Sequence, residues 1–222
     1  MPDGQYSFYL HSDDRTDIAA MATISTISQP LRGEFIRTAA TAGAVVYQVD
    51  ARLPALIPVF FAGQLSAVRL CAVMALVSGT WSSLTGLPDE PENGGAALPV
   101  SPETEYQRRR YTLTLQNGRS GERVESVLTE ASSRLRGDLL RNLIITGLAL
   151  HTTAPELPRL LASMPVPPTS VSELQSLVQQ MAGTADVNRA AAAVPDTPAA
   201  SAAPVSGRIP GNKENMRRAF GD

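Results

Sequence analysis

Arginine carries nearly all of the positive charge of this chain and gathers in one segment of it. The 222 residues include 18 arginines and a single lysine, Lys213. A guanidinium group can donate two parallel hydrogen bonds to a phosphate, which an ammonium group cannot do. From Arg108 to Arg141, eight arginines stand against four acidic residues, whereas the whole chain has a net charge of −2. This concentration predicts a surface that contacts the phosphates of a nucleic acid.

The arrangement of these arginines depends on the helix that carries them. One continuous helix would place Arg123, Arg134 and Arg141 within about 20° of one another, in a stripe that follows a phosphate backbone without reading bases. A solvated helix face with ion pairs, such as Glu130 with Arg134, is the alternative. A genome that favours arginine codons would also explain the excess of arginine. The predicted nucleic-acid-binding residues are Arg108, Arg109, Arg110, Arg119, Arg123, Arg134, Arg141, Arg217 and Arg218.

The residue types that perform catalysis or bind metals form no recognisable catalytic or metal-binding motif in this sequence. His11 stands near Asp13 and Asp14, but their spacing matches no standard metal-ligand motif, and a solvated turn explains them. His151 ends a predicted helix, where an imidazole can satisfy the terminal carbonyls. Cys71 lies in an apolar helical stripe, where burial would raise the pKa of its thiol and leave it inert. We therefore predict that the protein is not an enzyme and that it binds no metal and no cofactor.

Hydrophobic periodicity predicts a mainly helical body with a few short strands, with an α+β fold as the alternative. Helical spacing is clearest over residues 122–150, where Gly137 is a candidate for a kink or split, and over 63–83. A helix from Pro30 is expected to stop at Gly43. Residues 44–53 then have the β-branched density of a strand, although their alanines leave a helix open. Short strands are also predicted at residues 6–11 and from Arg108 to the Asn-Gly turn at 117–118. No internal repeat of 20 to 50 residues is visible.

Prolines and composition divide the chain. A folded body is predicted over residues 1–183, with a proline-rich loop at 87–102, a proline-punctuated linker at 154–169 and an amphipathic helix at 170–182, where Ser170 and Glu173 form a capping box. This helix must dock on the body or on a neighbouring copy. An extended or disordered Pro/Ala/Ser-rich arm with a basic tip follows at 184–222. The most apolar region, 53–77, is interrupted by polar residues and prolines, so we expect buried core rather than a membrane span, in a soluble, intracellular protein without a secretory signal.

The arm supplies a resemblance to a known family. Alanine, proline and serine make up 13 of the 17 residues from Ala190 to Ser206. This composition, the chain length, the single cysteine and the lack of catalytic motifs resemble the proline-alanine-serine-rich proteins of polymycoviruses. The resemblance implies a protein that coats a double-stranded RNA genome, and it carries over no site residue. The slightly acidic chain departs from the basic charge expected of a genome coat.

Together these observations predict a viral coat protein or nucleoprotein, located in a virion or ribonucleoprotein particle in the cytoplasm of a host cell. It would self-associate into a homo-oligomer such as a helical filament and bind genomic RNA, double-stranded in the family it resembles, through phosphate contacts without sequence preference. One alternative is a protein-only oligomeric scaffold or adaptor with a flexible arm. A second alternative is a small enzyme with a pocket around His11, Asp13 and Asp14.

Overall fold

The computed structural model describes residues 4–80 and 107–192, with side chains as far as residue 183 in the last helix. Most of these residues are helical and two strands accompany them, which confirms the predicted mainly α fold with a few short strands. The elements in chain order are β1 (Gln5–His11), α1 (Arg15–Ser25), the 3-10 turn η1 (Gln29–Leu31), α2 (Arg32–Val49), α3 (Leu53–Phe60), α4 (Ala67–Ser78), β2 (Arg108–Thr114), α5 (Arg119–Glu130), α6 (Arg136–Thr153), α7 (Leu157–Ser163) and α8 (Val171–Ala192).

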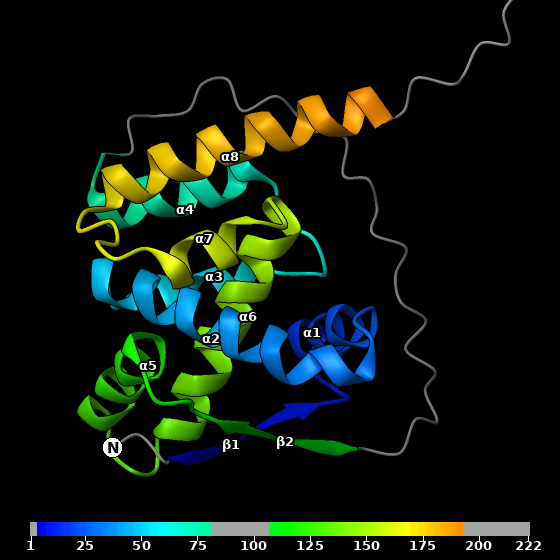
Figure 1. Ribbon diagram of the computed structural model, residues 1–222, viewed down its shortest axis with the longest axis vertical. Coiled ribbons are helices and arrows are strands. Elements are labelled where there is room, and N and C mark those ends of the chain that lie inside the picture. The colour runs from blue at the N-terminus through cyan, green and yellow to red at the C-terminus, as the bar shows by residue number, and fades with distance from the viewer. Residues whose placement is uncertain (1–3, 81–106, 193–222) are drawn as a thin grey trace, which may run out of the picture.

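The two described ranges are two copies of one arrangement, a strand followed by four helices (Figure 1). The sequence preserves the duplication in short stretches. Tyr-Ser-Phe-Tyr-Leu at 6–10 returns as Tyr-Thr-Leu-Thr-Leu at 111–115, and Leu-Arg-Gly-Glu at 31–34 returns as Leu-Arg-Gly-Asp at 135–138. From α1 onward the spacing between equivalent residues is constant. The unit is far longer than the 20 to 50 residues of a solenoid repeat. A search for repeats of that length therefore could not detect it.

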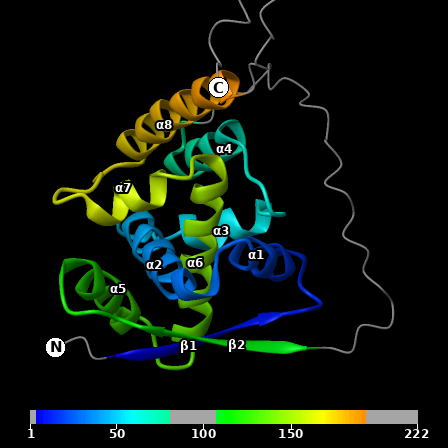
Figure 2. The ribbon, with the colours of Figure 1, turned by 45° about the vertical axis from the view of Figure 1, so that its right-hand side comes forward.

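The two copies meet strand to strand. β1 and β2 pair antiparallel, and Ser7 lies opposite Thr112. Because Ser7 and Thr112 are equivalent residues of the two copies, this is the pairing of a two-fold symmetric ribbon. All the helices described lie on one side of the ribbon (Figure 2). The ribbon therefore has one face covered by helices and one face turned away from them.

Helices α2 and α6 cross at the centre of the molecule, where two equivalent glycines allow close contact. A Cβ atom added at Gly43 would overlap the backbone carbonyl of Leu143, and one added at Gly147 would overlap that of Ala39. Ala39 and Leu143 are themselves equivalent, so the crossing repeats the two-fold relation seen in the ribbon. Glycine weakens a helix, but it is needed at these two positions because a side chain would force the two backbones apart.

This crossing corrects the prediction for the segment around Gly43. The helix does not stop there: α2 continues to Val49, so residues 44–49 of the expected strand are helical instead, and a short turn at 50–52 leads to α3, which begins at Leu53. Val45 and Val46 are fully buried against the other helices. Tertiary packing thus overrides the preference of β-branched residues for strands.

The second copy differs from the prediction in two places. The expected continuous helix over 122–150 is two helices, α5 and α6, separated by residues 131–135, just before the predicted breakpoint at Gly137. The predicted linker at 154–169 contains the short helix α7. The predicted loop at 87–102 lies outside the described residues. The predicted arm of 184–222 begins too early, because residues 184–192 belong to helix α8, and the rest of it lies outside the described residues.

Helices α4 and α8 form a layer at the end of the molecule far from the ribbon (Figure 2). The predicted helix at 170–182 docks on the body, where Leu174 and Val178 are completely buried, and it continues to Ala192. In the described part of the chain, no helix has both the length and the apolar character needed to cross a bilayer.

Equivalent serines cap these two helices. The Ser66 hydroxyl accepts a hydrogen bond from the N–H of Arg69 at 3.3 Å, and the Ser170 hydroxyl accepts one from the N–H of Glu173 at 3.2 Å. We expect Ser66→Ala and Ser170→Ala each to lower the free energy of unfolding by about 1 kcal/mol, because each leaves a helix N–H without its partner. Urea unfolding measures the effect. Ser172→Ala, at an exposed position in the first turn of α8, is the matched control, and an equal loss there would contradict the capping role.

Candidate nucleic-acid interface

The face of the ribbon toward the helices is apolar. Phe8, Leu10 and Leu113 are buried there. Phe8 also stacks on Tyr111, with ring centroids 5.3 Å apart. Side chains alternate between the two faces of a strand, so the residues between these ones point away from the core. Packing therefore fixes which side chains the ribbon displays.

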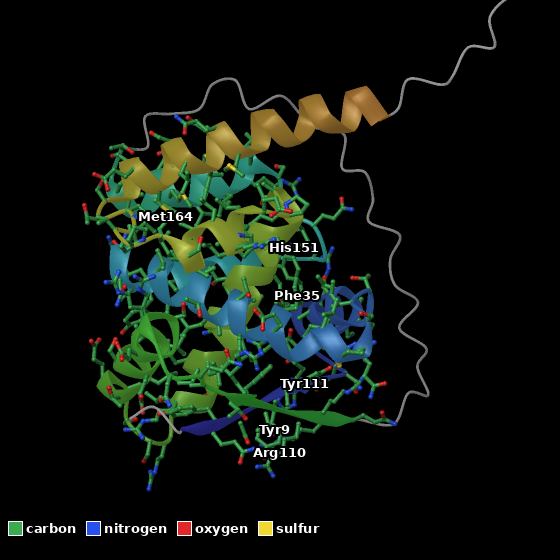
Figure 3. All side chains as sticks on the ribbon, in the orientation of Figure 1. Tyr9, Phe35, Arg110, Tyr111, His151 and Met164 are labelled. Atoms are coloured by element: carbon green, nitrogen blue, oxygen red, sulfur yellow. The ribbon has the colours of Figure 1, made fainter. Side chains whose placement is uncertain are left out.

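The outward face of the ribbon is polar and basic. Figure 3 shows Tyr9 and Arg110 on the side away from the helices, with Tyr111 on the side toward them. None of the eight residues at outward positions is acidic. They are Gln5, Ser7, Tyr9 and His11 on β1 and Arg108, Arg110, Thr112 and Thr114 on β2.

Two arginines on this face are held by β1. The guanidinium of Arg110 donates hydrogen bonds to the Ser7 hydroxyl at 2.9 and 3.2 Å. The guanidinium of Arg108 lies 3.5 Å from the centre of the Tyr9 ring, a cation–π contact. These contacts reduce the conformational freedom that each side chain would lose on binding a ligand. A guanidinium has five N–H donors, so several remain for a partner outside the protein.

The structure separates the other predicted binding arginines. Arg109 lies on the opposite face of β2 from Arg108 and Arg110, with its guanidinium 5.4 Å from the centre of the Tyr111 ring. Arg119 and Arg123 belong to α5, and Arg134 lies in the exposed connection to α6. The predicted stripe of Arg123, Arg134 and Arg141 on one helix is therefore wrong, because the helix is interrupted. Arg217 and Arg218 lie outside the described residues.

Arg141 is engaged in an ion pair inside the protein. Its guanidinium donates to the Asp17 carboxylate at 2.6 Å and approaches Asp14 at 3.3 Å. The Asp17 side chain is 1% exposed and also accepts a hydrogen bond from the N–H of His11 at 2.9 Å. Burial raises the pKa of the Asp17 carboxyl, and the His11 N–H and Arg141 oppose that rise. Arg141 thus ties α6 to α1 and to the end of β1, and it is not part of the outward face.

Replacing Arg141 by methionine is expected to destabilise the fold in a pH-dependent way. The change leaves the buried Asp17 carboxylate without its cation, at a cost of about 2 to 3 kcal/mol at pH 8, less than for a fully buried pair. Because the folded-state pKa of Asp17 is raised, its contribution to stability is full below the unfolded value of about 3.9 and is lost as the pH rises through the folded value. Urea unfolding of the variant should therefore show greater stability at pH 5 than at pH 8.

Arg37 provides the matched control for this change. It is the equivalent of Arg141 in α2, but its ion pair within the described residues is with Glu34, which is exposed. Such pairs contribute little, so Arg37→Met should cost well under 1 kcal/mol at both pH values. Equal losses for the two variants would contradict a special role for the Asp17 pair.

The histidines and the cysteine that could have served in catalysis or metal binding contact other groups of the protein. A ring nitrogen of His151 lies 3.1 Å from the carbonyl oxygen of Pro155, and the ring packs edge-on against Phe35 (Figure 3). Cys71 is buried, and that burial raises the pKa of its thiol. His11 donates its backbone N–H to Asp17. Among the described residues, no group of three or more His, Cys, Asp and Glu side chains could hold a metal ion.

Charge in the sequence singles out Arg108 and Arg110, but nothing in it singles out their neighbours on the same face. Gln5, Ser7, Tyr9, Thr112 and Thr114 are ordinary polar residues, and nothing in their types marks a site. The signal that could have found them is the repeated Tyr-x-x-x-Leu pattern of the two strands, read together with the repeated Leu-Arg-Gly. That pattern indicates two related strands, which antiparallel pairing can join into one ribbon.

The fold defined by these elements is a duplicated unit whose two strands form one ribbon over a shared helical core. A family model described as plasmid stability protein matches residues 4–74 and 109–178, and the chain belongs to this family. The two matched segments fall one in each copy of the duplicated unit. Comparison with curated proteins and with solved structures finds no significant match in either set.

This family overturns the viral interpretation of the sequence. The chain is not a polymycovirus protein, and the predictions of a genome coat, of a virion or ribonucleoprotein particle and of a host cytoplasm are wrong. The resemblance rested on the composition of residues 190–206, and the family match lies entirely outside that stretch. Low-complexity composition recurs in unrelated proteins, whereas the matched segments span the folded core.

Proposed function

We propose that this chain maintains its plasmid as a non-enzymatic DNA-binding protein that places the β1–β2 ribbon in the major groove of duplex DNA. The observation that carries the proposal is the outward face of the ribbon, where Arg108 and Arg110 are held in place by Tyr9 and Ser7. Membership of the plasmid stability family supports a role on plasmid DNA. A protein that stabilises a plasmid through its DNA must distinguish that DNA from the chromosome, and contacts to base edges supply such discrimination.

The dimensions of the ribbon suit the major groove. Two antiparallel strands of seven residues each make a ribbon about 20 Å long. The major groove of B-form DNA is about 12 Å wide and admits such a ribbon. Because the described helices lie on one side of the ribbon (Figure 2), its other face can approach the floor of the groove without any of them in the way.

The chemistry of the outward face suits base edges as well as phosphates. Arginine pairs with the O6 and N7 acceptors of guanine, glutamine pairs with adenine, and serine and threonine bond to either. Proteins that read DNA with strands use such side chains from a ribbon seated in a groove. The proposal therefore concerns duplex DNA rather than single strands, whose unstacked bases bind aromatic platforms instead.

Titration of the purified protein against fluorescent DNA tests the proposal. We expect the anisotropy of a labelled duplex of about 20 base pairs, roughly two helical turns, to rise at low salt. The affinity should fall steeply from about 50 to 200 mM salt, because bound counterions are released from the phosphates. A single strand of the same sequence should bind more weakly. Failure to bind any duplex at low salt would overturn the proposal.

A further inference from the structure

The duplication lets each outward residue of β1 be compared with its equivalent on β2. Ser7 corresponds to Thr112, and these two residues lie opposite each other at the centre of the ribbon. The residues on either side of this centre do not match. Gln5 on β1 corresponds to Arg110 on β2, and Tyr9 corresponds to Thr114.

This mismatch matters because the two side chains prefer different bases. In the major groove, arginine donates two hydrogen bonds to guanine O6 and N7, whereas glutamine donates to N7 and accepts from N6 of adenine. A ribbon made by two identical strands presents the same side chain at both positions and therefore favours a palindromic site. This ribbon presents a guanidinium at one position and a carboxamide at the equivalent position.

The register also sets the distance between the two positions along the ribbon. Gln5 lies at the level of Thr114, and Arg110 lies at the level of Tyr9, four residues further along β1. Four residues of an antiparallel strand span about 14 Å, which is about four base-pair steps at roughly 3.4 Å each. Both side chains can therefore reach the same stretch of groove.

Resting on the proposed function, we infer that the chain reads a non-palindromic DNA site in a single orientation. Arg110 selects a guanine in one half of the site, and Gln5 selects an adenine at the two-fold-related position in the other half. The hydrogen bonds from Arg110 to Ser7 hold the guanidinium near the centre of the ribbon and leave other N–H donors for the base.

Selection of bound sequences from a pool of random DNA duplexes tests this inference. The wild-type protein should enrich a motif whose two halves differ, with guanine and adenine at the two related positions. Gln5→Arg makes these ribbon positions alike and should convert the motif to one with guanine in both halves. Arg110→Gln should give adenine in both halves. Both side chains are exposed, so neither variant disturbs the core.

The possible outcomes separate this inference from the proposed function. Enrichment of a palindromic motif by the wild-type protein would overturn the inference and leave the proposed function intact. An asymmetric motif that neither substitution changes would overturn the assignment of Gln5 and Arg110. If the protein binds no duplex at low salt, the proposed function itself is overturned. Arg69→Gln, which changes an exposed arginine of α4 at the far end of the molecule, should leave the motif as it is.

Discussion

Replacing Arg108 and Arg110 together by alanine should lower the affinity for the selected DNA site by about two to four orders of magnitude. Each arginine that pairs with guanine is worth about 1 to 3 kcal/mol of discrimination. The two side chains lie on the same outward face, and each is held by a residue of β1. Anisotropy titrations at fixed salt concentration would measure the loss. The free energy of unfolding should change little, because both side chains are exposed.

The control for this prediction is the same pair of substitutions at arginines far from the ribbon. Arg69 in α4 and Arg159 in α7 are exposed, and Arg69→Ala with Arg159→Ala removes the same net charge. That variant should bind within a few-fold of the wild-type protein, since distant charges act mainly through screened, long-range attraction. Equal losses in the two double variants would show that net charge, and not the ribbon, governs binding.

Replacing either Gly43 or Gly147 by alanine should destabilise the fold by about 3 kcal/mol or more. In each case the new Cβ atom would overlap the backbone of the facing helix, and backbone cannot move aside as a flexible side chain can. The two glycines are equivalent, so their effects should be similar. Thermal or urea unfolding would measure the loss, and the double variant is expected not to fold.

Gly183→Ala in α8 separates this crowding from the general effect of alanine in a helix. A Cβ atom at Gly183 meets no described atom within 4 Å. Alanine favours the helix over glycine by up to about 1 kcal/mol, so Gly183→Ala should leave stability unchanged or raise it slightly. If Gly43→Ala raised stability as much as Gly183→Ala does, α2 and α6 would not be in close contact.

The helical character of the fold could be predicted because local sequence sets it. The apolar stripes of α4 and α8 and the Ser170 cap are local signals, and they identified real helices. The path of α2 through Gly43 was not predictable in this way, because a partner helix distant in sequence supplies the reason for the glycine. Val45 and Val46 likewise have a local preference for strands that burial against other elements overrides.

The candidate site was found only in part, for a related reason. The arginines at 108–110 stand out by charge, but strand alternation turns Arg109 to the other face. The partners Ser7 and Tyr9 lie about a hundred residues earlier, and only strand pairing brings them close. Duplication was the missing information: two recognised copies of a strand suggest an antiparallel pair that is two-fold symmetric and has one shared face. The divergence of the copies hid that relation in all but a few short stretches.

Linking both strands in one polypeptide has a consequence for mass action. Where two separate subunits supply the strands, the complete ribbon disappears on dilution below their dissociation constant. Here β1 and β2 meet in an intramolecular step whose equilibrium does not depend on protein concentration. A cell with very few molecules of this protein would still hold every one of them with its ribbon assembled. Occupancy of a DNA site by one ribbon would then rise with the first power of protein concentration rather than with its square.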